Sequence, residues 1–176
     1  TEKELRLKNQ LDQCFLTADD EMIHQEVLKV LSDTFHTNLN LLGFIEKGSD
    51  VFEIDTVYTT PGTQGQLPQV SWRFPKSDWR GIWGRALRQQ KPFIQEDGFN
   101  VPEGHPEVIR SLMAPILFKG DLVGLLHLAN KPSPFTHNDL DLLVAVAAHL
   151  GPIFTARLGR KKEMDQRKET ERALKE

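Results

Sequence analysis

Apolar residues recur at helical spacing near the start of the chain. Leu7, Leu11, Cys14 and Ala18 follow one another at steps of four, three and four residues. Because residues at these steps share one face of an α-helix, residues 1–18 are predicted to form an amphipathic leading helix.

A second helix is predicted from about Asp19 to Thr37. Its start follows Thr17 at the Ser/Thr-x-x-Asp/Glu spacing that often begins a helix. An apolar stripe with a step of four residues runs through it, made of Ile23, Val27, Leu31 and Phe35. The break between the two helices is therefore expected near Thr17.

Short runs rich in apolar, β-branched and aromatic residues predict strands in the middle of the chain. Two of these runs flank Lys119-Gly120-Asp121, a glycine-containing turn, which predicts a β-hairpin. The predicted strands cover residues 41–46, 51–58, 69–74, 112–118 and 122–129.

Two more helices complete the pattern. Residues 79–90 predict a short helix that ends before Pro92, and residues 139–158 predict a buried closing helix. Helices at both ends with strands and one short helix between them indicate an α+β fold with an antiparallel sheet.

Charge divides the chain into two parts. The 176 residues carry a net charge of −3, but the segment from Arg157 to Glu176 carries +3 and the rest −6. A nearly neutral chain lacks the basic face that nucleic-acid binding requires, so no nucleic-acid partner is expected. Residues 159–176 are interpreted as a charged helical linker to a downstream domain, or alternatively as a solvated helical face.

The single cysteine, Cys14, cannot form a disulfide within the chain. This favours a reducing compartment, and a cytoplasmic location is expected. No apolar run approaches the roughly 20 residues of a membrane span, so no membrane insertion is expected.

Motifs for catalysis or metal binding are missing from the sequence. There is no His-x-x-x-His, His-Glu-x-x-His or Cys-x-x-Cys, no Gly-x-Ser-x-Gly and no phosphate-binding glycine loop. His127 lies between two leucines in a predicted strand, where a hydrogen-bonded sheet histidine is favoured over a pocket residue. A metal site and a catalytic role for this domain are therefore not expected.

An aromatic cluster is the best candidate for a small-molecule site. The three tryptophans fall within twelve positions, close to glycine-containing loops and to several basic side chains. Aromatic walls with a few convergent polar groups are typical of such sites, although the tryptophans could equally fill the second face of the sheet. The candidate ligand-binding residues are Trp72, Trp79, Trp83, Arg85, His105 and Arg110.

Several stretches together resemble the GAF domain of bacterial and archaeal sensor kinases. They are residues 79–87, 101–105, 114–124 and 128–131, followed by Phe135 and Asp139. The last part is similar to the family's Asn-Lys-Phe-Asp-Glu signature, with Leu140 in place of the final Glu. The resemblance implies that Asn130, Lys131, Phe135 and Asp139 form a structural scaffold, in which Lys131 and Asp139 are an ion pair near the pocket and not ligand contacts. The missing Glu argues against cyclic-nucleotide binding of the phosphodiesterase kind.

The resemblance also implies an architecture and a role. It places a GAF sensor at residues 19–158, with the terminal helices on one face of the sheet and a ligand pocket on the other. The implied function is sensing of an unidentified small molecule, within a sensor histidine kinase or a PAS/GAF receptor. Homodimerisation through the terminal helices and a downstream PAS or kinase output domain are expected.

Two alternatives remain open, namely a ligand-free dimerisation and relay module and, less favoured, an enzyme of the same fold. Because the one cysteine precedes the domain, the sequence disfavours covalent bilin, cysteine-linked haem and methionine sulfoxide reductase chemistry.

Overall fold

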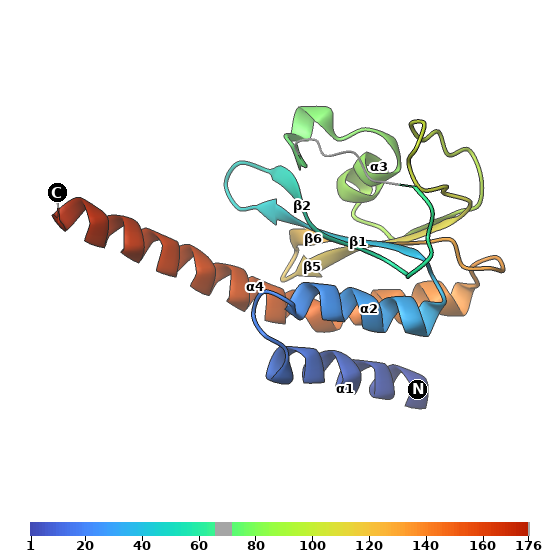
Figure 1. The fold of residues 1–176 in the computed structure, drawn as a ribbon, viewed down its shortest axis with the longest axis horizontal. Coiled ribbons are helices and arrows are strands. Elements are labelled where there is room, and N and C mark those ends of the chain that lie inside the picture. The colour runs from blue at the N-terminus through green and yellow to red at the C-terminus, as the bar shows by residue number, and fades with distance from the viewer. Residues whose placement is uncertain (66–71, 176) are drawn as a thin grey trace.

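The computed structural model describes residues 1–65 and 72–175, which form one antiparallel sheet with helices on both faces (Figure 1). The helices are α1 (Glu2–Thr17), α2 (Ile23–Phe35), α3 (Gly81–Gln89) and α4 (His137–Lys175), with a 3-10 turn at Lys76–Asp78. The strands are β1 (Leu39–Glu46), β2 (Val51–Thr59), β3 (Arg73–Phe74), β4 (Phe93–Gln95), β5 (Ser111–Phe118) and β6 (Asp121–Ala129). Their order across the sheet is β3-β2-β1-β6-β5-β4. The predicted α+β fold with an antiparallel sheet is confirmed.

The two faces of the sheet are covered differently. Helices α2 and α4 lie against one face, and α1 packs on the outer side of these two helices (Figure 1). The short helix α3 and the long loops lie over the opposite face, which we call the second face (Figure 1). Both chain ends therefore contribute to one helical layer, and the second face belongs to the middle of the chain.

Each face has its own apolar core because side chains alternate along a strand. In β5, Leu112 and Ala114 join the core of the helical layer, and Met113 joins the core of the second face. This two-sided burial explains why the hairpin strands have nearly continuous apolar sequences.

The predicted start of the second helix is wrong. The break near Thr17 is present, but α2 begins only at Ile23, and its cap residue Met22 makes no side-chain hydrogen bond. The Thr17 hydroxyl donates to the carbonyl of Gln13 within α1 instead of capping α2. The Ser/Thr-x-x-Asp/Glu spacing therefore lies at the end of one helix and not at the start of the next.

The strand predictions were largely correct. The hairpin is present as β5 and β6, but the expected strand at residues 69–74 is seen only at Arg73–Phe74, and residues 69–71 lie outside the described part. Strand β4, of three residues, was not predicted because so short a run carries no periodicity.

Helix α4 continues without interruption through the predicted linker. Leu143, Val146, Leu150 and Phe154 are buried, whereas residues 159–175 are exposed and extend away from the sheet (Figure 1). By length and composition alone, α4 has one stretch apolar enough to cross a membrane. About 33% of that stretch is buried, in the core of the helical layer.

Candidate functional site

The second face is centred on a contact between α3 and β6. The Trp83 side chain extends from α3, and its indole Nε1 donates a hydrogen bond to Nδ1 of His127 at 3.0 Å. The rings of Phe52 and Phe74 meet the indole edge-to-face, with centroids 6.1 and 5.9 Å away. The indole therefore occupies an aromatic site whose polar group is a strand histidine.

This contact fixes the tautomer of His127. An indole nitrogen only donates, so Nδ1 must accept, and the proton of the neutral ring must be on Nε2. Nε2 lies 2.7 Å from the hydroxyl oxygen of Ser111, to which it donates. Burial disfavours the charged ring and lowers the pKa of His127 to about 3. The histidine is thus a neutral, fully hydrogen-bonded link between α3 and two strands.

The Ser111–His127 pair is not arranged for nucleophilic catalysis. A general base must offer an unprotonated nitrogen to the serine hydroxyl, whereas Nε2 of His127 already carries its proton. Ser111 is also fully buried. The sequence-based expectation of a hydrogen-bonded sheet histidine is confirmed.

The three tryptophans come together in the core of the second face. Trp79 is buried, and its Nε1 donates to the carbonyl of Phe74 at 3.0 Å. A Cβ on Gly84 would lie 2.4 Å from the backbone of Trp79, so this glycine permits the start of α3 to pack closely on the preceding turn. Trp72 and Trp83 remain partly exposed.

The other candidate residues lie in separate surroundings. Arg85 is exposed, with its guanidinium 4.4 Å from the ring centroid of Phe93. The Nδ1 of His105 lies 2.6 Å from the carbonyl oxygen of Pro106, to which it donates. Gly65 approaches the same backbone, so the loops around residues 65 and 105 meet each other.

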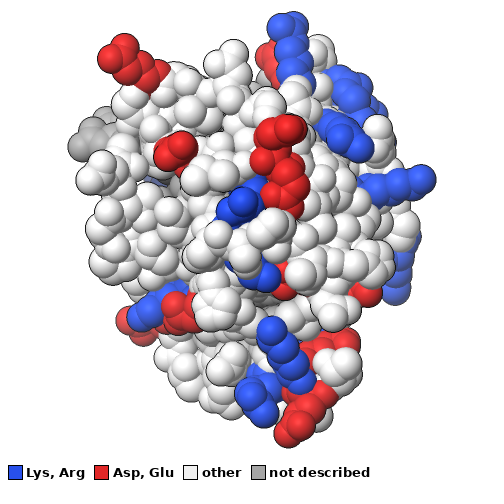
Figure 2. All heavy atoms as spheres, turned by 90° about the vertical axis from the view of Figure 1, so that its right-hand side faces the viewer, with Lys and Arg blue, Asp and Glu red and all other residues white. Residues whose placement is uncertain are grey.

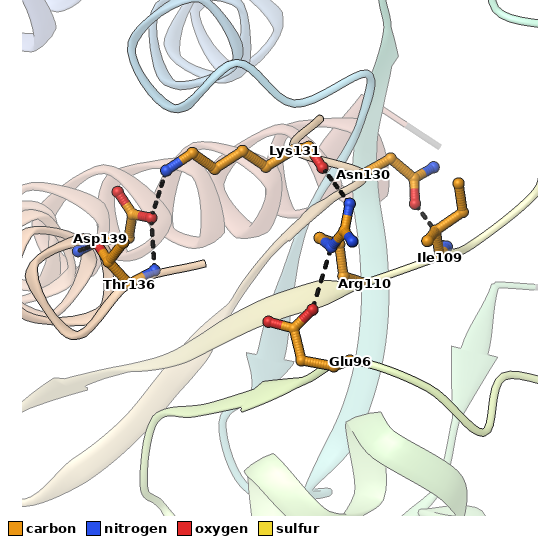
Figure 3. Close-up of polar contacts among 7 residues, drawn as sticks. All are labelled: Glu96, Ile109, Arg110, Asn130, Lys131, Thr136 and Asp139. Atoms are coloured by element: carbon orange, nitrogen blue, oxygen red, sulfur yellow. Dashed lines mark hydrogen bonds and ion pairs between the residues drawn. The ribbon is translucent and has the colours of Figure 1, made fainter. Parts of the chain in front are cut away.

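Arg110 belongs to a network at the edge of the sheet (Figure 3). Its Nε donates to Glu96 at 3.1 Å, and its Nη1 donates to the carbonyl of Lys131 at 2.9 Å. Lys131 Nζ in turn donates to Asp139 Oδ2 at 2.7 Å. The network joins β4, β5 and β6 to the start of α4.

Asp139 also caps α4. Its carboxylate accepts from the Thr136 amide at 2.8 Å, and the Thr136 hydroxyl accepts from the Asp139 amide at 3.1 Å, a reciprocal capping box. Burial opposes ionisation of Asp139, but the hydrogen bonds from Lys131 and Thr136 outweigh it and lower the carboxyl pKa. The same carboxylate therefore fixes the helix start and holds Lys131.

Asn130 and Phe135 complete the scaffold. Asn130 has a φ of +69°, and its side-chain oxygen accepts from the Ile109 amide at 2.7 Å (Figure 3). Its amide nitrogen donates to Asn38 at 2.9 Å. Phe135 is buried in the core of the helical layer, on the other side of the sheet from Trp83.

Sequence reasoning missed Ser111, the hydrogen-bond partner of His127, and Phe52, a ring that packs on Trp83. Ser111 lies 16 positions from His127 and Phe52 lies 31 positions from Trp83, and no local pattern relates such residues. Alternation in β5 does place Ser111 on the same face as Met113. That was the one signal available, and it depends on knowing the strand register.

The surface adds two observations. On the side shown in Figure 2, acidic and basic side chains are scattered among large uncharged areas, with several basic groups along one edge. Among residues 1–65 and 72–175, no group of three or more His, Cys, Asp or Glu side chains could hold a metal ion. Two open hollows lined by described residues lie on the helical layer, between α1 and α2.

Solved structures share this fold at low sequence identity. The GAF domain of a phosphoenolpyruvate-protein phosphotransferase from Coxiella burnetii superposes with a TM-score of 0.71 at 18% identity, covering 90% of this chain and 97% of that one. The phycocyanobilin-bound GAF domain of a cyanobacterial phytochrome gives 0.64 at 14% identity, covering 89% and 96%. The free methionine-R-sulfoxide reductase of Neisseria meningitidis gives 0.61 at 19% identity, covering 89% and 92%.

The sequence itself gives the decisive match. No protein of curated function matches the chain, but the profile of the GAF domain family matches residues 18–155, most of its length. The fold and this match agree, and the chain belongs to the GAF domain family.

Proposed function

We propose that this chain is a sensory GAF module in which a small molecule at the second face changes the position of α4. The observation that carries the proposal is the dual environment of α4. Its first half is buried against the sheet, and its second half, residues 159–175, is an exposed continuation of the same helix. A displacement of the buried half must therefore also displace the exposed half.

Close contact between α4 and the sheet supports this coupling. A Cβ on Gly151 would lie 2.7 Å from the carbonyl oxygen of Leu117 in β5, so helix and strand touch without an intervening side chain. At the start of α4, the Lys131–Asp139 ion pair connects it to the end of β6. Strand movements caused by a ligand thus have two rigid routes to α4.

The ligand site proposed is the second face and its rim. Trp72 and Trp83 offer partly exposed aromatic surface, and Arg85, His105 and Arg110 are basic or titratable groups on the surrounding elements. The aromatic surface of Trp72 and Trp83 suits a planar molecule, and the basic groups lie apart from one another around it. The parent protein is proposed to be a cytoplasmic receptor, of the sensor histidine kinase or PAS/GAF type, which dimerises through its terminal helices.

A second candidate is a ligand-free relay module. It is favoured by the hydrogen bonds of Trp79 and Trp83, which fill the second face with the protein's own side chains. A reductase activity like that of the Neisseria relative has less support, because Cys14 lies in α1 within the core of the helical layer.

A ligand screen followed by a distance measurement tests the proposal. Thermal-shift assays of the purified chain would use nucleotides, amino acids, aromatic acids and haem. Any compound that stabilises the chain is then added to a Cys14→Ala variant in which Lys47, between β1 and β2, and Arg160, in α4, are replaced by spin-labelled cysteines. A change in the label distance supports relay through α4, and an unchanged distance contradicts it. If no compound raises the melting temperature, the ligand-free relay is the better description.

A further inference from the structure

A groove runs between α1 and α2 on the outside of the helical layer. Two hollows of about 450 and 470 Å³ lie along it, and both are lined by Gln10 and Gln13 of α1. The α2 side is lined by Met22 and Glu26 at one end and by Val30 and residues 33–34 at the other. Nothing among the described residues covers this groove.

One wall of the groove is acidic and the other is uncharged. Asp19, Glu26 and Asp33 line it at intervals of seven residues, whereas α1 contributes Gln10, Gln13 and Thr17. Burial, and then the charge of Glu26, raise the pKa of the Cys14 thiol, which also lines the groove. Glu26 lines the same hollow as Cys14.

The exposed extension of α4 carries the complementary pattern. Lys161, Lys168 and Lys175 also recur at intervals of seven residues. Seven residues are nearly two helical turns, so these lysines share one face, with a spacing of about 10 Å at 1.5 Å per residue. Glu26 and Asp33 recur at the same interval on α2, so they match the spacing of Lys168 and Lys175 and are opposite in sign, whereas Asp19 precedes the helix.

The extension cannot reach the groove of its own molecule. Helix α4 is continuous to Lys175 and points away from α1 and α2 (Figure 1). The chain also separates charge, with +3 from Arg157 onward and −6 before it. A second copy of the chain supplies the matching surface.

We propose that the α4 extension of a second copy lies in the α1–α2 groove, with Lys168 and Lys175 facing Glu26 and Asp33. This inference rests on the proposed function, because it gives the dimer of the relay a specific contact. Reciprocal docking of two copies closes the assembly as a two-fold dimer. The α4 extension of each copy then lies against α1 and α2 of the other copy.

Charge reversal tests this contact in the whole chain. Dimer dissociation constants are measured by sedimentation equilibrium for the wild type and for Lys168→Glu, Glu26→Lys and the protein carrying both changes. Arg167→Glu is the matched control, because it makes the same change of charge about 100° away around the helix. Circular dichroism shows whether each variant keeps its helices.

The expected result is a pattern across the four variants. Each single reversal at 168 or 26 weakens the dimer about tenfold, since an attractive pair becomes a repulsive one. The variant with both changes returns to within about threefold of wild type, and Arg167→Glu changes the constant less than threefold.

Three outcomes would overturn the inference. If Lys168→Glu and Arg167→Glu weaken the dimer equally, the effect comes from net charge and not from a contact of Lys168. If none of the changes alters the dimer dissociation constant, the α4 extension does not bind in the groove, and the proposed relay is unaffected. A protein that is monomeric up to 100 μM contradicts both the groove contact and dimerisation in the relay, and the ligand test then stands alone.

Discussion

The indole of Trp83 donates to Nδ1 of His127 at 3.0 Å, and this single bond joins α3 to the middle of β6. Replacing Trp83 by Phe keeps an aromatic ring but leaves the buried nitrogen without a donor, at an expected cost of about 1–3 kcal/mol in the free energy of unfolding. Urea denaturation measures the change.

A double-mutant cycle separates this hydrogen bond from the lost ring volume. In His127→Leu the acceptor is absent, so the further change Trp83→Phe should cost at least about 1 kcal/mol less than it does in the wild type. Additive costs would mean that the hydrogen bond contributes nothing.

Acid should destabilise the fold through His127. Its pKa is about 3 in the folded protein and 6.5 ordinarily, so between these values only the unfolded chain binds the proton. The neutral form is stabilising, and its contribution is complete above pH 6.5 and is lost as the pH falls toward 3. The loss is on the order of 4 kcal/mol across this window.

Urea titrations from pH 7 to pH 4 would show this loss, with His127→Leu as the control. The variant should lack the slope between pH 6 and 4.5, where carboxylates with depressed pKa values contribute little. Because the remaining histidines are present in both proteins, their effects cancel in the comparison. Parallel slopes would contradict a neutral, buried His127.

Asp139→Ala should destabilise the junction between sheet and α4. It removes the partner of Lys131 and half of the capping box, with an expected cost of about 1–3 kcal/mol at pH 7. The matched control is Asp141→Ala, which removes an exposed carboxylate 3.6 Å from His137 and should cost less than about 0.5 kcal/mol. Because the Asp139 pKa is lowered, its charge-dependent stabilisation is lost as the pH falls below about 4, and the two variants should converge there. Equal costs at pH 7 would refute this role.

Gly151→Ala should force α4 away from β5. The new methyl group would lie 2.7 Å from the Leu117 carbonyl oxygen, a rigid backbone atom, so about 1–3 kcal/mol of stability is expected to be lost. Gly159→Ala is the control on the same helix, since no atom beyond the neighbouring helix backbone lies within 4 Å of its Cβ position. It should be stabilising by about 0.5–1 kcal/mol, because alanine is the better helix former. Thermal unfolding followed at 222 nm measures both, and a similar result for the two would contradict tight helix–strand packing.

Local pattern was enough for most of the secondary structure. The hairpin of β5 and β6 follows from two apolar runs around a glycine turn, and the apolar face of α4 follows from a repeat of three and four residues. These signals are strong because both the periodicity and the turn are local properties of the chain. Where the signal was a single side chain, as at Thr17, the prediction of a helix start failed, since that hydroxyl bonds to the preceding turn.

The surroundings of the candidate site residues required the fold. The sequence placed three tryptophans close together, and it could not distinguish a ligand wall from core packing, because both need aromatic residues on one face. The packing of Trp83 on His127 depends on how α3 lies over β6, which brings residues 44 positions apart into contact.

The sequence by itself therefore determined the order of elements, the two-part charge distribution and the family, because periodicity, composition and motif are written along the chain. Only the tertiary structure decided which polar groups meet. Whether His127 is neutral, which groups hold Arg110, and that Gly151 touches Leu117 all depend on distances between residues that are not neighbours in sequence. Burial then sets their energies, since a hydrogen bond or a charge removed from water must find its partner in the fold.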